Sequence, residues 1–149
     1  MSATYYLHVG AGEKKIMNGS CLCGAVAFEA SGAAEFRYCH CSRCRKSRGT
    51  AFAANMFSRP ADFRWTRGED KIVKYKLPSA QRYGNWFCGI CGSPTPRMVD
   101  ALDVMLIPAG TLDDDPNVRA SYHIFVGSKA PWHEITDDLP QYREYPPRK

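Results

Sequence analysis

The placement of cysteine is the feature that most constrains this chain. Its seven cysteines fall into three short clusters and none is isolated: Cys21-Leu22-Cys23, Cys39-His40-Cys41-Ser42-Arg43-Cys44 and Cys88-Gly89-Ile90-Cys91. Inert core cysteines would be scattered, so the clustering indicates thiols that act together. In a reducing compartment such thiols are more often metal ligands or catalysts than disulfides.

The remaining composition is that of a water-soluble globular protein. Hydrophobic residues make up 44% of the 149 residues and charged residues 23%. No stretch approaches the roughly 20 apolar residues of a membrane-spanning helix. The amino terminus, MSATYYLHVGAGEKKIMNG, lacks a basic start followed by an apolar run, which indicates no signal peptide. We therefore expect one cytoplasmic domain over residues 1–149, with no membrane partner.

Short apolar or alternating runs, bounded by Gly, Pro, Asn, Asp or Ser, recur along the sequence. They predict a mainly β fold of short antiparallel strands. The expected strands are Ala25–Ala30, Phe36–Cys41, Thr50–Phe57, Lys71–Leu77, Tyr83–Phe87, Val104–Ala109 and Arg119–Val126. Helix is scarce, with one or two turns expected at Ser42–Lys46 and a capping Ser at their start. The Pro-rich tail after Leu139 is expected to be extended and partly loose.

Two of the clusters contain two cysteines each, Cys21 with Cys23 and Cys88 with Cys91. In an extended segment alternate side chains share a face, so Cys21 and Cys23 point the same way. The spacing of Cys88 and Cys91 suits a tight turn with permissive glycines beside it. Two plus two predicts a closed zinc site with four cysteine ligands, whose binding energy would contribute directly to folding.

The middle cluster offers three ligands. Cys39 and Cys41 alternate onto one face, Cys44 lies one helical turn beyond, and His40 is directed to the opposite face. A three-ligand zinc keeps a coordination position open, which is typical of catalytic or ligand-binding sites. Another partition stays possible, in which Cys21 and Cys23 pair with Cys39 and Cys41, but it leaves the remaining cysteines without a complete site.

Four cationic residues surround this middle cluster: Arg43, Arg45, Lys46 and Arg48. A basic cluster is usually a solvated face and less often a site for nucleic acid or an anion. Beside a thiolate-bound zinc, these cations favour charge compensation and capture of a small anion.

Four segments carry a family resemblance: GSCLCGAVAFEA, YCHCSRCRKSRGTAFAANMF, WFCGICGSP and HIFVGSKAPWHEI. Over roughly residues 17–142 the chain resembles the glutathione-dependent formaldehyde-activating enzymes, a family that includes centromere protein V. The resemblance implies a β-tent fold with two zinc ions. It implies a structural site at Cys21, Cys23, Cys88 and Cys91, and a second site at Cys39, Cys41 and Cys44.

The activity implied by the resemblance joins glutathione to formaldehyde, giving S-hydroxymethylglutathione, and is classed as a carbon–sulfur lyase. A zinc with three thiolate ligands suits a soft fourth ligand such as a substrate thiolate, which could attack a small aldehyde. One or two of the four cations named above would then hold glutathione carboxylates. His123 and Lys129 are candidates for an acid or a charge clamp, although a strand histidine is as often structural.

Three other functions remain open. The chain could be a zinc-containing thiol-binding or protein-interaction module without catalysis. A nucleic-acid zinc module is disfavoured because the sequence lacks a zinc-knuckle or a helix-borne zinc-finger pattern. A thiol redox protein using Cys88 and Cys91 is disfavoured because no βαβ context surrounds them. The oligomeric state is not predicted.

Overall fold

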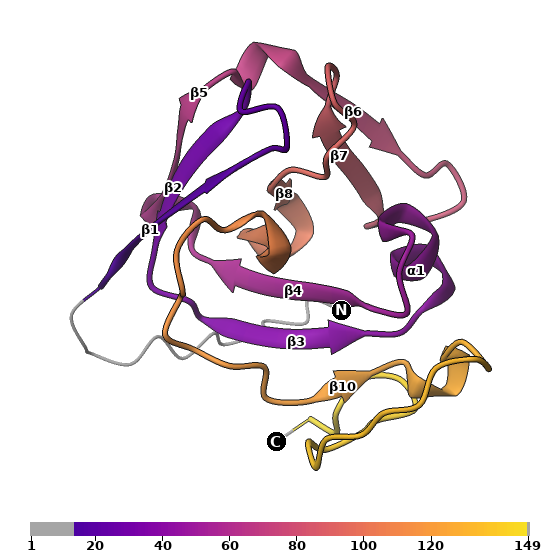
Figure 1. Cartoon of the computed structure of the whole chain (residues 1–149). Helices are drawn as coiled ribbons and strands as arrows, with labels where there is room; N and C mark the ends of the chain where they lie inside the picture. Colours follow the sequence, from indigo (N-terminus) through magenta and orange to yellow (C-terminus); the bar gives the residue numbers. More distant parts are fainter. Residues whose placement is uncertain (1–13, 149) are drawn as a thin grey trace.

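The structure is a computed structural model that describes residues 14–148. The prediction that the amino terminus carries no signal peptide falls mainly on residues outside this range. Three separate sheets form the sides of a tent-like arrangement (Figure 1). A three-stranded sheet lies at the upper left of that view, a two-stranded hairpin at the upper right, and the β3 and β4 strands of the largest sheet run across the base.

The largest sheet has the strand order β10-β3-β4-β9-β8. Its strands are β3 (Glu35–Cys39), β4 (Ala53–Ser58), β8 (Arg97–Val99), β9 (Val104–Pro108) and β10 (His123–Ile124). The three-stranded sheet has the order β1-β2-β5, with β1 at Ile16–Ser20, β2 at Ala27–Ser31 and β5 at Phe63–Arg67. Strands β6 (Ile72–Lys76) and β7 (Gly84–Cys88) form the hairpin.

Helix is limited to one α-helix and short 3-10 turns among the described residues. The α-helix, α1, spans Ser42–Arg48 and follows β3 almost directly. The 3-10 turns are η1 (Pro60–Asp62), η2 (Glu69–Lys71), η3 (Asp100–Leu102), η4 (Ala109–Thr111) and η5 (Val126–Ser128).

Register gives the five-stranded sheet two different faces. Met56 of β4 pairs with Ile107 of β9, and both side chains are fully buried. They pack against Met17 and Phe28 of the three-stranded sheet, so this face is buried in a hydrophobic core cluster between the two sheets. Because side chains alternate along a strand, the neighbouring positions Asn55 and Phe57, with their cross-strand partners, point to the other face. That second face carries the site described below.

The sequence prediction of a mainly β fold with little helix is confirmed. Each of the seven expected runs overlaps a strand, but β1, β5 and β8 were missed. The sequences of β1 and β5, IMNGS and FRWTR, contain turn-forming or charged residues, and β8 has only three residues. Strand β10 pairs with β3 in parallel, so the expectation of antiparallel strands is wrong for that pair.

Two local expectations also need correction. The N-cap of α1 is Cys41 rather than Ser42, and its sulfur accepts a hydrogen bond from the backbone N–H of Cys44. The tail after Leu139 is not loose as far as Glu144. Its backbone is hydrogen-bonded to β10 and to the turn that follows, including the Tyr142 N–H to the His123 carbonyl at 3.0 Å.

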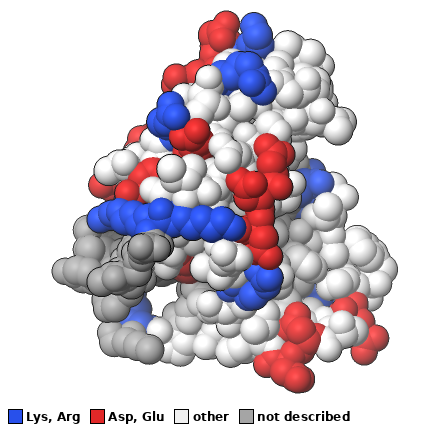
Figure 2. Space-filling view, turned by 60° about the vertical axis from the view of Figure 1, so that its left-hand side comes forward, with Lys and Arg blue, Asp and Glu red and all other residues white. Residues whose placement is uncertain are grey.

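Charged side chains of both signs are mixed on the outer surface of the molecule. On the face shown in Figure 2, basic and acidic side chains are interspersed rather than gathered by sign. Several form exposed ion pairs, such as Arg64 with Glu29 and Arg119 with Asp115. Across residues 14–148, the helices are all too short or too polar to span a bilayer.

The close approach of two loops beside the core gives a stability prediction. Gly68 has φ +74°, and a Cβ there would lie 1.9 Å from the carbonyl oxygen of Ala25. Gly49, the C-cap of α1, has φ +63° with no atom within 4 Å of such a Cβ. Both alanine variants are strained by the left-handed backbone, but only Gly68→Ala must also displace backbone. In thermal melts Gly68→Ala should unfold at least about 5 °C below Gly49→Ala; equal melting temperatures would contradict the close packing.

Candidate metal centres and ligand cavity

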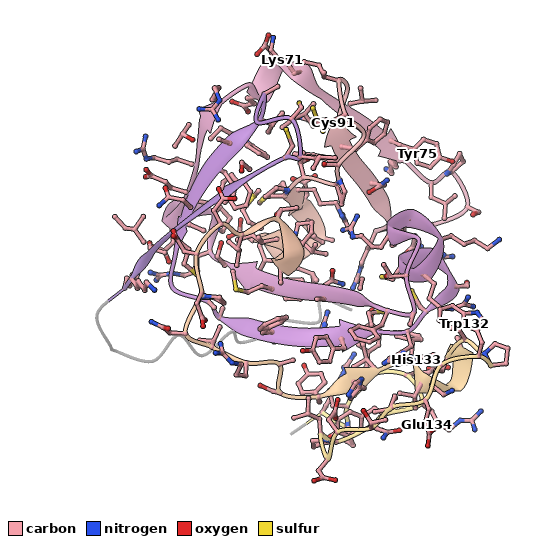
Figure 3. The ribbon with its side chains drawn as sticks, viewed as in Figure 1. Lys71, Tyr75, Cys91, Trp132, His133 and Glu134 are labelled. Atoms are coloured by element: carbon pink, nitrogen blue, oxygen red, sulfur yellow. The ribbon has the colours of Figure 1, made fainter. Side chains whose placement is uncertain are left out.

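The first cysteine cluster joins two segments that are far apart in sequence. Cys21 and Cys23 lie in the loop after β1, Cys88 ends β7, and Cys91 lies in the turn beyond it. All four sulfurs lie within 4.8 Å of one another. Cys91 marks this cluster at the top of the molecule in Figure 3, where the three-stranded sheet meets the β6–β7 hairpin.

Backbone geometry shapes both halves of this cluster. Gly24 and Gly92 adopt φ +78° and +75°, the left-handed conformation that lets each loop turn tightly after its cysteines. The Val26 N–H donates to the Cys21 sulfur at 3.3 Å, and the Leu22 N–H donates to the Ser93 hydroxyl of the other loop at 2.9 Å. These hydrogen bonds therefore hold the two loops together and also orient the Cys21 sulfur.

The four-cysteine cluster fits a tetrahedral thiolate site. Zn–S bonds of about 2.3 Å place ligating sulfurs about 3.8 Å apart. The Cys21 and Cys23 sulfurs lie 3.6 Å apart, and those of Cys23 and Cys88 lie 3.9 Å apart. All seven cysteines are free thiols, so no disulfide competes for these ligands. The donor set and spacing fit one zinc ion.

The second cluster is built where β3 runs into α1. Cys39 is the last residue of β3, Cys41 caps the helix, and Cys44 lies in its first turn. Their three sulfurs also lie within 4.8 Å of one another. Asn55 of β4 adds a polar neighbour, with its amide nitrogen 4.0 Å from the Cys44 sulfur. The structure thus contains two cysteine clusters that could each hold a metal ion, and their thiol ligands are consistent with zinc.

Electrostatics limit how many of these three thiols can be ionised at once without a cation. Hydrogen bonds from Cys39 and Cys44 lower the pKa of the Cys41 thiol to about 2. The same contact with Cys41 raises the pKa of Cys39 far above its ordinary value. One sulfur can ionise readily, but a second negative charge beside it is strongly opposed. A divalent cation among the sulfurs removes this conflict and allows three thiolates.

The three-cysteine cluster opens into a cavity of about 630 Å³. This cavity lies on the second face of the five-stranded sheet, and all three cysteines are in its wall. The wall includes apolar side chains such as Phe57, Leu106 and Ile124. The Asn55 side chain also faces the cavity, and its carbonyl oxygen is buried without a partner among the described residues. A buried acceptor of this kind is available to a donor on a ligand.

The cavity is strongly cationic. Five arginines line it, and no Asp or Glu of residues 14–148 does: Arg37, Arg43, Arg82, Arg97 and Arg148. Arg37 is neutralised by Glu35 at 2.7 Å and stacks on the Phe57 ring. Arg97 is only 9% exposed and forms no ion pair with a described residue. Burial lowers its pKa, and the charge of nearby Arg48 acts in the same direction.

The structure brings only one of the four sequence-predicted cations to this cavity. Arg43 lines it, but Arg45, Lys46 and Arg48 do not. Arg48 turns away along α1, donates to the Asn85 side chain at 2.9 Å, and lines a separate cavity next to Cys21. The helical turn explains the difference, because residues on a seven-residue helix point in several directions and cannot all face one ligand.

The two residues predicted to be catalytic lie outside the cavity wall. His123 pairs with Tyr38 across the parallel β10–β3 strands, on the face opposite Cys39, and is 1% exposed. Its Nδ1 lies 2.8 Å from Nε2 of His40, and its Nε2 lies 3.0 Å from Asp137. The Lys129 amine donates to backbone carbonyls of Ala130 and His133. A catalytic role for either residue stays a prediction.

His40 is directed away from the neighbouring sulfurs, as the alternation along β3 predicts. Its ring is fully buried, contacts His123 and stacks on His133 with centroids 5.9 Å apart. Figure 3 shows His133 beside β10, next to Trp132, at the end of the molecule away from Cys91. These rings connect the loop between Cys39 and Cys41 to the carboxyl-terminal segment.

Sequence reasoning missed the arginines that come from other elements, above all Arg82 and Arg97. Arg97 is the single charged residue of the run SPTPRMV, directly after the Cys88–Cys91 turn. The sequence signal that could have identified Arg97 is a single cationic residue in a short uncharged run next to a predicted metal site. Its position in the cavity wall depends on β8 pairing with β9, which places Arg97 opposite Leu106.

Comparison with known proteins gives a consistent family assignment. A crystal structure of a Rhodobacter sphaeroides protein is 30% identical in sequence, and the match covers 69% of this chain and 91% of that one with a TM-score of 0.55. No curated protein matches the sequence. The profile of the glutathione-dependent formaldehyde-activating enzymes matches residues 16–128, which is more than half of the chain and includes both cysteine clusters. The chain described here therefore belongs to the glutathione-dependent formaldehyde-activating enzyme family.

Proposed function

We propose that this chain is a cytoplasmic, zinc-dependent enzyme of the carbon–sulfur lyase type that adds a thiol such as glutathione to formaldehyde or another small aldehyde. Family membership supports an activity of this kind. The observation that carries the proposal is the position of the Cys39, Cys41 and Cys44 cluster in the wall of a 630 Å³ cavity with arginines around it. A cavity of this size takes a ligand of tripeptide dimensions.

The two cysteine clusters have different roles in this proposal. Cys21, Cys23, Cys88 and Cys91 would hold a structural zinc with no free position. Cys39, Cys41 and Cys44 would hold a second zinc, which leaves a position for an exogenous thiol and lowers the pKa of that thiol. Arg43, Arg82 and Arg97 bind the carboxylates of the thiol and so orient its sulfur toward the cysteines.

The addition reaction needs little from the protein beyond the positioning of the thiol and the aldehyde. The thiol sulfur forms a bond to the aldehyde carbon, and the thiol proton ends on the aldehyde oxygen. Apolar wall residues such as Phe57 and Leu106 limit water around the sulfur. The carbonyl oxygen of Asn55 is placed to accept a hydrogen bond from an N–H of a peptide-like thiol.

One observation favours a second candidate, a thiol-binding module without catalysis. His123 and Lys129, the residues predicted as acid or clamp, lie outside the cavity wall. If no other group transfers a proton, the protein would bind a thiol without accelerating its addition to an aldehyde. The two functions are separated by the rate of S-hydroxymethylglutathione formation, measured with and without protein.

Metal content is the first test. The two clusters predict two zinc ions per chain in protein purified without chelator. Elemental analysis together with thiol titration measures this directly. A value near one would leave only one cluster as a zinc site, and intact disulfides without metal would refute both.

The two sites should differ in their contribution to stability. Cys88→Ser removes a fully buried ligand from the site that joins the loop after β1 to the β7 turn, and so should lower the melting temperature by more than about 10 °C. Cys44→Ser should leave a folded protein with one zinc and a smaller shift. The reverse order of melting temperatures would mean that the structural and open sites are exchanged.

Thiol binding tests the open position. Glutathione should bind to zinc-loaded protein at least about ten-fold more tightly than S-methylglutathione, which has the same carboxylates but no free thiol. Raised salt should weaken glutathione binding because it screens the cavity arginines. In cobalt-loaded protein, glutathione should also change the thiolate-to-metal absorption.

The corresponding activity assay is the formation of S-hydroxymethylglutathione from glutathione and formaldehyde, with Cys44→Ser as the matched control. A rate above the uncatalysed reaction for the unsubstituted chain, but not for Cys44→Ser, supports the enzyme. Thiol binding without acceleration supports the binding module. No thiol-dependent binding and no spectral change would refute both.

A further inference from the structure

Phe125 has an unusual backbone conformation for a bulky residue. Positive φ occurs at three non-glycine positions of the described chain, Asp103, Asn117 and Phe125, and Phe125 has φ +55° and ψ +36°. Asp and Asn tolerate this left-handed conformation, whereas an aromatic residue in it is a strained outlier. Such strain persists only where the surrounding structure holds it, and it is concentrated at functional sites.

Hydrogen bonds on both sides of the residue hold this conformation. The Phe125 N–H donates to the Glu144 carbonyl at 3.1 Å, and the Phe125 carbonyl accepts from the Ser128 N–H at 3.0 Å. The Phe125 ring also meets the Tyr145 ring edge to face, with centroids 5.0 Å apart. The carboxyl-terminal segment therefore fixes both the backbone and the ring of Phe125.

The left-handed turn brings this ring into the cavity that contains the three cysteines. Ile124 pairs with Cys39 across β10 and β3, and both side chains line the cavity, whereas His123 faces the opposite side. In a continued strand Phe125 would follow His123 to that opposite side, because side chains alternate. Phe125 lines the cavity beside Ile124 instead. The strained backbone thus has a defined consequence for the site.

Two aromatic side chains, Phe125 and Tyr83, pack against the buried group that includes two of the cysteines. The group consists of Cys39, Cys44, Ala53 and Ile124. Tyr83 comes from the loop of the β6–β7 hairpin and Phe125 from the end of β10, elements that lie above and below β3 in Figure 1. Tyr83 is held in place by its hydroxyl, which donates to the Arg43 carbonyl at 3.1 Å. Two fixed rings therefore limit the space beside the cysteines.

We infer that Phe125 is a specificity-determining residue: its ring restricts the space around the reacting sulfur, so that the protein selects thiols and aldehydes without branches at the carbon that this sulfur joins. This inference rests on the proposed thiol function and adds a steric limit to it. The addition product has two carbons on the same sulfur, one from the thiol and one from the aldehyde. A methyl group on either carbon meets the Phe125 ring, which the fixed backbone prevents from withdrawing.

The test compares N-acetylcysteine with N-acetylpenicillamine, which has the same carboxylate and two added methyl groups on the carbon that bears the sulfur. Binding to cobalt-loaded, full-length protein is followed by the thiolate-to-metal absorption. The unsubstituted chain should bind N-acetylcysteine at least about ten-fold more tightly. Phe125→Gly removes the ring, and glycine adopts positive φ without strain. This variant should reduce the affinity ratio at least about five-fold.

The aldehyde gives a second readout with glutathione as the thiol. Acetaldehyde has one methyl group on the carbon that the sulfur attacks, and formaldehyde has none. Phe125→Gly should raise the catalysed rate with acetaldehyde, relative to that with formaldehyde, by about ten-fold. Comparing this ratio between variant and unsubstituted chain removes the difference in intrinsic reactivity between the two aldehydes.

Two further variants make the outcome specific. Leu102→Ala widens the wall of the same cavity at another place, because Leu102 packs against a separate buried cluster, and it should leave both ratios unchanged. Phe125→Leu keeps part of the bulk and should give ratios between those of the unsubstituted chain and Phe125→Gly. It also provides the measurement if Phe125→Gly does not fold, which thermal melts show.

The results separate this inference from the proposed function. A fall in selectivity in the Phe125 variants, but not in Leu102→Ala, supports the steric role. If the thiols bind but the ratios do not change in the Phe125 variants, or change equally in Leu102→Ala, that role is refuted while the thiol function stands. If neither thiol nor glutathione changes the absorption of the unsubstituted chain, the thiol function fails and the steric role falls with it.

Discussion

The convergence of four cysteine sulfurs from two distant loops is the contact on which the rest of this architecture depends. Cys23, in the loop after β1, and Cys88, at the end of β7, are 65 residues apart in sequence, yet all four sulfurs lie within 4.8 Å. The β6–β7 hairpin is a two-stranded sheet, and such a hairpin has little stability of its own in water. Its attachment at Cys88, packed with Val26 and Ile72, is what holds it against the three-stranded sheet.

That attachment also determines where the cavity is. The loop that connects the two strands of the hairpin contributes Arg82 and Tyr83, and these side chains close one side of the space in front of the three cysteines. Strand β8, which follows the second pair of cysteines, contributes Arg97. The four-cysteine cluster therefore lies between the two segments that supply this cationic wall, the β6–β7 hairpin and β8.

Strand alternation separates the chemistry of the two faces. Along β3, Arg37 and Cys39 face the cavity, while Tyr38 and the following His40 face the opposite side. The buried contacts of His40 with His123, and of His123 with Asp137, belong to that opposite side and join the cysteine loop to the carboxyl-terminal segment. The cavity consequently combines thiols, arginines and an amide, and no histidine of residues 14–148 lines it. The proposed binding of an anionic thiol rests on this set of side chains.

Much of this could be predicted from the sequence, because the relevant patterns are local. Cysteine spacing predicted a 4 + 3 grouping, and alternation along residues 36–41 predicted that His40 points away from its neighbours. The runs of apolar residues predicted seven of the strands, although short or charged strands such as β5 and β8 lacked that pattern. Cys41 as the N-cap of α1 was missed because sulfur is not a usual capping acceptor.

The charged residues that line the cavity at the three cysteines could not be predicted in the same way. Cations adjacent in sequence to the triplet were expected to face it, but a short helix directs Arg45, Lys46 and Arg48 elsewhere, and only Arg43 reaches the cavity. Arg82 and Arg97 reach it through the pairing of strands remote in sequence. The sequence by itself determined which neighbouring thiols point the same way, because spacing within a turn or strand fixes side-chain direction. That Cys21 and Cys23 meet Cys88 and Cys91, and not Cys39 and Cys41, is seen only in the tertiary structure. Only the tertiary structure decided which charges surround them, because long-range strand register, and not local spacing, brings those side chains to the same face.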